Sequence, residues 1–252
     1  MKKIIIANWK MNPRTAEEAK KIFTKISSRL SGARKSDIVI CPPFIYLEKF
    51  RKMSRKFFFG AQNAFLGGMG AFTGEISTDM LYELGVKFVI LGHSERRALG
   101  EGHVLINRKI KSALASGLVP ILCVGENERD ENHKYFDVVK SQILECLAGI
   151  QKSSISKIIV AYEPVWAIST TKNRKDASPE DIREMAIFIR KVLSDKFGTD
   201  AKKTRVLYGG SVNERDAEDF VRDGEVDGLL VGKASLDPEK FAKIVKMTEN
   251  VR

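Results

Sequence analysis

Three residues with complementary chemistry lie at the ends of short apolar runs far apart in the chain: Lys10, His93 and Glu163. A carboxylate can act as a general base, and an imidazole can transfer a proton or donate a hydrogen bond. An ammonium group can stabilise developing negative charge. Taken singly, each has an ordinary explanation: an ion-paired glutamate, a hydrogen-bonded core histidine and a solvated lysine. Together they indicate proton-transfer chemistry, provided that the fold brings them to one place.

Two further apolar runs end in turns that contain glycine. One turn is Gly209-Gly210-Ser211 and the other is Gly232-Lys233. Backbone N–H groups in such turns can hold a phosphate, but glycine is also a common turn residue, so each turn is weak support alone. No nucleotide-binding loop accompanies them, and no cofactor is expected.

The elements that must position these residues are short strands with apolar residues at successive positions. This pattern is typical of parallel strands that are covered on both faces. The runs are KIIIAN (3–8), DIVIC (37–41), FFFGAQ (57–62), FVILG (88–92), VPILCVG (119–125), KIIVAYEP (157–164), RVLYGG (205–210) and DGLLVG (227–232).

Helix-like segments separate the strands. Thr15 and Glu18 form a predicted capping box for a helix that continues towards Leu30, and 134–150 and 179–197 carry apolar residues at helical spacing. Eight strands alternating with helices predict a closed (β/α)₈ barrel in one domain, residues 1–252. An open, doubly wound sheet is the alternative. In a barrel, the loops that follow the strands gather at one face, where all the residues above would meet.

Composition limits the classes of function. The 252 residues carry a formal net charge of +11, but the basic residues are spread along predicted helices, which favours a solvated cationic surface over a nucleic-acid footprint. No window approaches the roughly 18 apolar residues of a membrane span. Three cysteines without CxxC spacing indicate reduced, buried thiols in the cytoplasm. The three histidines are scattered, so no metal site is expected.

Six stretches resemble signatures of the triosephosphate isomerase family, in the same order and at matching separations over essentially the whole chain. They are ANWKMN (7–12), GAFTGEIS (70–77), VILGHSERR (89–97), AYEPVWAI (161–168), YGGSV (208–212) and DGLLVG (227–232). The resemblance implies a TIM barrel and a cofactor-free isomerase that interconverts D-glyceraldehyde 3-phosphate and dihydroxyacetone phosphate through an enediolate. It also implies a role in glycolysis and gluconeogenesis.

The resemblance implies a role for each residue that carries chemistry. Glu163 is expected to shuttle a proton between adjacent carbons, and His93, as a neutral imidazole, to polarise the carbonyl. Lys10 is expected to stabilise the enediolate, Asn8 to add a hydrogen bond beside it, and Glu95 to position the lysine. These roles come from the family resemblance and not from the spacing of the residues.

The same resemblance implies where phosphate and a second subunit would bind. The expected phosphate contacts are Ser169, Ser211, Gly209, Gly210, Gly232 and Lys233. The loop around Thr73, which includes GGMG (67–70), is expected to dock into a second subunit beside Lys10 and form a homodimer.

Two departures from the family concern phosphate holding. The segment after Glu163 reads AISTTK, with Ser169 and Thr171 in place of two glycines, and three more residues precede Pro179. A non-glycine residue in a left-handed conformation costs roughly 1–2 kcal/mol, so we predict a lid with altered hinges. Lys233 replaces a glycine, and its ammonium group points either to the phosphate or, more in keeping with a lysine, to solvent.

Two other functions remain open at this point. A phosphate-binding relative that closes too poorly for turnover would keep the same pocket. A nucleic-acid-binding protein would use the basic surface, and its affinity would fall steeply with salt.

Overall fold

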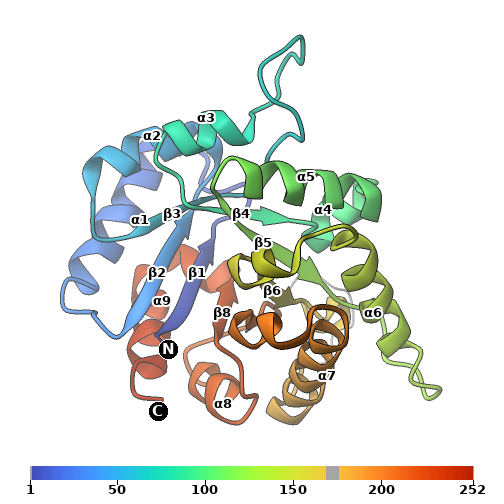
Figure 1. Ribbon diagram of the computed structural model, residues 1–252. Helices are drawn as coiled ribbons and strands as arrows, with labels where there is room; N and C mark the ends of the chain where they lie inside the picture. The colour runs from blue at the N-terminus through green and yellow to red at the C-terminus, as the bar shows by residue number, and fades with distance from the viewer. Residues whose placement is uncertain (1, 169–175, 252) are drawn as a thin grey trace.

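In the computed structural model, which describes residues 2–168 and 176–251, eight strands form a closed barrel (Figure 1). Each strand is parallel to the next, and β1 pairs with β8 to close the ring. The predicted (β/α)₈ barrel is therefore confirmed, and the open sheet is excluded. The strands are β1 Lys3–Asn8, β2 Ser36–Cys41, β3 Phe58–Ala61, β4 Phe88–Leu91, β5 Val119–Val124, β6 Ile159–Tyr162, β7 Arg205–Tyr208 and β8 Gly228–Val231.

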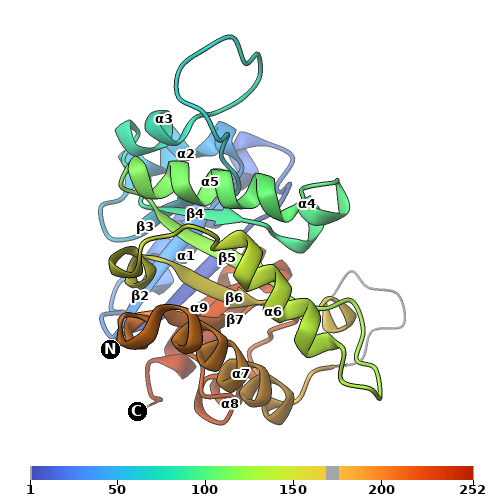
Figure 2. The same ribbon diagram turned by 45° about the vertical axis from the view of Figure 1, so that its right-hand side comes forward.

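Helices surround the barrel on the outside, as both views show (Figures 1 and 2). The α-helices are α1 Ala16–Arg29, α2 Phe44–Met53, α3 Thr78–Glu83, α4 Ser94–Ala98, α5 His103–Ala115, α6 Tyr135–Cys146, α7 Pro179–Phe197, α8 Ala217–Arg222 and α9 Pro238–Thr248. The described part of the chain also contains the short 3-10 helices η1 Lys152–Lys157, η2 Val165–Ala167, η3 Gly198–Lys203 and η4 Lys233–Leu236. None of the helices in the described ranges has the length and apolar character required to cross a bilayer.

Local side chains fix where the helices begin. The predicted capping box of Thr15 and Glu18 is present before α1, and Ser178 and Asp181 form a second one before α7. Pro179 occupies the first turn of α7, where its missing N–H leaves no hydrogen bond unmade. The helix predicted over 134–150 is shorter in the structure. It is α6, which ends at Cys146, and a turn then leads to η1.

The core has two parts because the strands bury both faces. Ile4 and Ile6 of β1 point into the barrel, while Ile5 and Ala7 pack against the outer helices. All four are fully buried, which explains the continuous apolar runs. The three cysteines are free and buried as predicted, and burial raises the pKa of each thiol.

The seam between β1 and β8 depends on a glycine. Gly228 has φ of +156°, and a Cβ atom there would lie 1.9 Å from the carbonyl oxygen of Ile4. The Ile4 N–H also donates to the Asp227 carbonyl at 3.1 Å. The first residue of β8 therefore has no room for a side chain where the barrel closes.

Candidate active site

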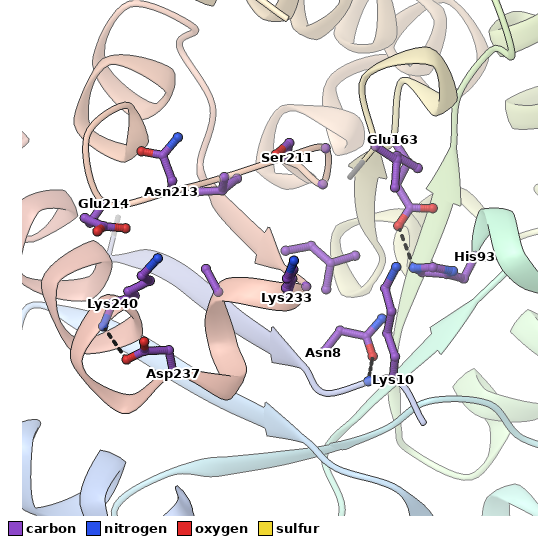
Figure 3. A pocket seen from close by; sticks show the side chains of 17 residues that line it. Asn8, Lys10, His93, Glu163, Ser211, Asn213, Glu214, Lys233, Asp237 and Lys240 are labelled. Atoms are coloured by element: carbon purple, nitrogen blue, oxygen red, sulfur yellow. Dashed lines mark hydrogen bonds and ion pairs between the residues drawn. The ribbon is translucent and has the colours of Figure 1, made fainter. Parts of the chain in front are cut away.

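A cavity of about 550 Å³ opens at the end of the barrel where the strands finish. It is lined from β1, β4, β6, β7 and β8, so the topology brings together the residues singled out in the sequence. Figure 3 shows the side chains of Lys10, His93 and Glu163 together on one side of this cavity, with Ser211 and Lys233 further across it. Of the expected site residues, the lining includes Asn8, Lys10, His93, Glu163, Gly209, Gly210, Ser211, Gly232 and Lys233.

Glu163 follows β6 directly and is only 2% exposed. Its Oε1 atom lies 3.1 Å from Nε2 of His93 (Figure 3). Its Oε2 atom accepts the Ser94 N–H at 3.1 Å. Its own N–H donates to the Val124 carbonyl at 2.7 Å, which fixes the backbone against β5. The carboxylate is thus held by protein donors in a largely water-free position, which suits a base.

His93 is the N-cap residue of α4, and this position sets its tautomer. The Nδ1 atom accepts the backbone N–H of Glu95 at 3.2 Å, so the ring proton lies on Nε2. An imidazole that accepts at Nδ1 is neutral, and its Nε2–H can donate to an oxygen in the cavity. The side chain is 8% exposed, which limits competition from water.

Lys10 follows β1 with φ of +52°, a conformation that non-glycine residues rarely adopt. Its N–H donates to Oδ1 of Asn8 at 3.0 Å, and its carbonyl accepts from Nε2 of Gln62 at 2.9 Å. Its ammonium group contacts Oε1 of Glu95 at 2.6 Å. Three neighbours therefore hold a strained backbone and its charged side chain beside the cavity, as is common at functional sites.

The two glycine turns line the cavity on the side of β7 and β8, but their glycines differ in what they offer. The Gly209 N–H already donates to the Tyr162 carbonyl at 2.8 Å, which extends the β6–β7 pairing. Gly209 instead leaves space, because a Cβ atom there would lie 3.0 Å from Cγ of Glu163. At Gly210, a Cβ atom would lie 2.3 Å from the Tyr208 hydroxyl oxygen. Close packing therefore leaves little room for a side chain at Gly209 and none at Gly210 unless Tyr208 moves.

The lysine that replaces a glycine after β8 is at the start of η4. Lys233 is exposed and also lines the cavity, so its ammonium group is accessible to both solvent and a bound anion (Figure 3). Ser169 and Thr171, on which the altered-lid hypothesis depends, lie outside the described residues.

Sequence reasoning missed one buried carboxylate behind Glu163. Glu126 is 1% exposed, and its Oε1 atom accepts from the Tyr162 hydroxyl and from Trp166 Nε1, each at 2.7 Å. Burial and the Glu126 charge raise the pKa of Tyr162, so that hydroxyl remains a donor. Glu126 therefore fixes the chain on both sides of Glu163. The signal was its place after Gly125 at the end of β5, a strand end that was not considered.

The arrangement suits proton transfer next to a carbonyl group. It combines a buried base, a neutral hydrogen-bond donor 3.1 Å from that base, and a cation whose backbone is held in place. The glycine turns and Lys233 provide a polar, partly cationic wall on the side of β7 and β8 for the remainder of a small anionic substrate.

Comparisons with known proteins agree with this site. The family model described as triosephosphate isomerase matches residues 3–248. The chain is similar to the triosephosphate isomerases of Dictyoglomus thermophilum and Aquifex aeolicus, each 45% identical over 97% of this chain and 99% of the relative. The enzyme of Caldanaerobacter subterraneus is 43% identical over 96% of this chain and 98% of its own length. With matches of this extent and identity, the chain belongs to the triosephosphate isomerase family.

Proposed function

We propose that this chain interconverts D-glyceraldehyde 3-phosphate and dihydroxyacetone phosphate without a cofactor, with Glu163 as the base. Membership of the family provides the overall reaction. The observation that supports the roles of individual residues is the Glu163–His93 pair, 3.1 Å apart in a cavity that Lys10 also lines.

Glu163 transfers the proton. Its carboxylate takes a proton from the carbon beside the carbonyl, giving an enediolate, and returns the proton to the neighbouring carbon. His93 has one proton at Nε2 and cannot donate it both to Glu163 and to the substrate. Substrate binding therefore replaces the 3.1 Å His93–Glu163 contact with a contact from His93 to the carbonyl oxygen, and the carboxylate turns towards the carbon.

Lys10 and His93 stabilise the negative charge that develops on the carbonyl oxygen. Both groups are in place before the reaction, so little reorganisation is needed when the charge forms. Asn8 and Glu95 act through Lys10: the first accepts its backbone N–H and the second contacts its ammonium group.

The phosphate group is held on the side of the cavity formed by the turns after β7 and β8. Backbone groups of Gly210, Ser211 and Gly232 are the proposed contacts, and the Lys233 ammonium group adds a positive charge within reach of the same space. Gly209 contributes by leaving room for Glu163, because its N–H is already used. The proposed contact through Ser169 rests on the sequence alone.

Turnover by the purified protein tests the proposal. We expect glyceraldehyde 3-phosphate to be converted with kcat above about 10 s⁻¹, the middle of the range for enzymes. A dehydrogenase that oxidises NADH with dihydroxyacetone phosphate reports the product. Binding of glycerol 3-phosphate by a folded protein that shows no turnover would contradict the proposal and favour a phosphate-binding relative.

We further propose a cytoplasmic homodimer in which each chain is one catalytic domain, residues 1–252. The loop around Thr73 projects beyond the helices in both views (Figures 1 and 2). The two ends of this loop are joined by a hydrogen bond from the Phe65 N–H to the Ile76 carbonyl at 2.8 Å. Between them, Met69 is 92% exposed and Phe72 is 51% exposed. Apolar side chains on a projecting loop are typical of a protein–protein contact.

Met69→Glu is expected to shift the protein from dimer to monomer. The change places a charge in the proposed contact but costs little in the isolated chain, because Met69 is 92% exposed. Light scattering after size-exclusion chromatography measures the mass. Ile187→Glu on α7 is the matched control, since it adds the same charge at an exposed apolar position elsewhere. An unchanged dimer in Met69→Glu would contradict this assembly.

A further inference from the structure

A second cavity, of about 510 Å³, lies at the opposite end of the barrel, where strands begin. Its lining comes from the residues that precede or start β4, β5, β6 and β7, together with the end of α5. The 3-10 helices η1 and η3, which pack against each other, border it. It shares none of its lining with the active-site cavity, so the proposed isomerisation leaves it without a role.

The charge around this cavity is mostly positive. Lys87, Lys157 and Lys203 line it, are exposed, and form no ion pair with a carboxylate in residues 2–168 or 176–251. Among the described residues of the lining, the one acid is Asp37, and its Oδ2 atom lies 3.5 Å from Arg205. The acid is thus already balanced, and three ammonium groups remain without an acidic partner. A cleft lined by one sign of charge concentrates ions of the opposite sign.

The wall of the cavity is apolar and firmly packed. Phe88, Leu118 and Ile158 contribute to the lining and are at most 5% exposed. The Nζ atom of Lys87 lies 5.7 Å from the centroid of Phe88 in this wall, and 4.3 Å from that of Phe58, which lies outside the lining. The cations therefore stand at the rim of an apolar hollow, an arrangement that fits a ligand with a charged head and an apolar body.

We propose that this cavity binds small organic anions in which a phosphate or carboxylate group is attached to an aromatic or aliphatic group. The anion contacts Lys87, Lys157 and Lys203, and the apolar group lies against Phe88 and Leu118. A neighbouring cavity shares Lys87 and adds Arg51 and Arg55, which extends the positive charge along the same end of the barrel.

Titration calorimetry with phenyl phosphate tests the site, in the presence of just enough glycerol 3-phosphate to fill the active site. Its polar glycerol group cannot pack against the apolar wall, so it should compete only weakly at this cavity. We expect the wild type to bind phenyl phosphate. The double variant Lys157→Ala/Lys203→Ala should have a Kd about tenfold higher or more, because each substitution removes a charge-assisted contact with the anion. The substitutions remove exposed side chains outside the isomerase site, so glyceraldehyde 3-phosphate turnover should stay unchanged. Turnover tests the proposed isomerase function and calorimetry tests the second cavity. A failure of one proposal therefore leaves the other to be judged by its own measurement.

Lys20→Ala/Lys21→Ala is the matched control, because it removes the same charge from exposed positions of α1. Phenyl phosphate should bind this control like the wild type, and should bind more tightly than inorganic phosphate or phenol. If both double variants lost the same affinity for phenyl phosphate, the loss would be explained by net charge alone, and the proposal would be overturned. Equal affinity for inorganic phosphate would exclude a role for the apolar wall. Absence of wild-type binding would also overturn the proposal, and would leave Lys157 and Lys203 only to complement the C-terminal ends of η1 and η3.

Discussion

Glu163→Gln is expected to lower kcat for glyceraldehyde 3-phosphate by about 10²–10⁴-fold, the usual contribution of a positioned general base. The substitution keeps the shape of the side chain, and its amide oxygen can still accept the Ser94 N–H that Glu163 accepts at 3.1 Å. It removes the group that takes the proton. Coupled assays give kcat, and solvent deuterium incorporation at the substrate carbon, followed by NMR, reports proton removal directly.

Two measurements separate loss of the base from loss of the fold. The melting temperature and glycerol 3-phosphate binding of Glu163→Gln should remain near those of the wild type, because the phosphate end of the cavity is untouched. Glu163→Asp keeps the carboxylate but withdraws it by one methylene, so it should exchange solvent deuterium at a rate reduced by about 10²-fold. Deuterium exchange by Glu163→Gln at the wild-type rate would show that another group is the base.

The positions of the elements could be predicted from the sequence because their signals are local. Consecutive apolar residues mark strands with two buried faces, and Thr15 with Glu18 marks the start of α1 by a hydrogen-bond pair three residues apart. Once the strands are placed, barrel closure requires their ends to converge, so Lys10, His93 and Glu163 had to share one mouth.

Contacts between side chains from different loops could not be predicted in this way. Glu126 is joined to Trp166 across 40 positions, and nothing in either local sequence specifies that bond. The sequence predicts that the Gly209 N–H contacts phosphate. In the structure, the register between β6 and β7 makes this N–H donate to the Tyr162 carbonyl. The left-handed backbone of Lys10 was also missed, because it results from Asn8 and Gln62 holding the residue from two sides.

Lys10→Met is expected to lower kcat by about 10²–10³-fold, the usual effect of removing one preorganised group that stabilises developing charge. Methionine keeps a long apolar stem but has no charge, so packing beside Gly232 should persist. KM should rise as well, because a cation attracts the anionic substrate before reaction. Steady-state kinetics of the wild type and the variant, at two salt concentrations, measure both parameters.

Glu95→Gln distinguishes the charge of Lys10 from the ion pair that holds it. The Lys10 and Glu95 side chains are 21% and 47% exposed, and pairs of this kind usually contribute only about 0–1 kcal/mol. Glutamine still offers an oxygen to the ammonium group, so kcat should fall by no more than about fivefold. A loss as large as that of Lys10→Met would mean that placement by Glu95, and not the positive charge itself, limits the rate. The left-handed backbone of Lys10, held by two further hydrogen bonds, argues for the smaller loss, because it aims the side chain even when Glu95 is changed.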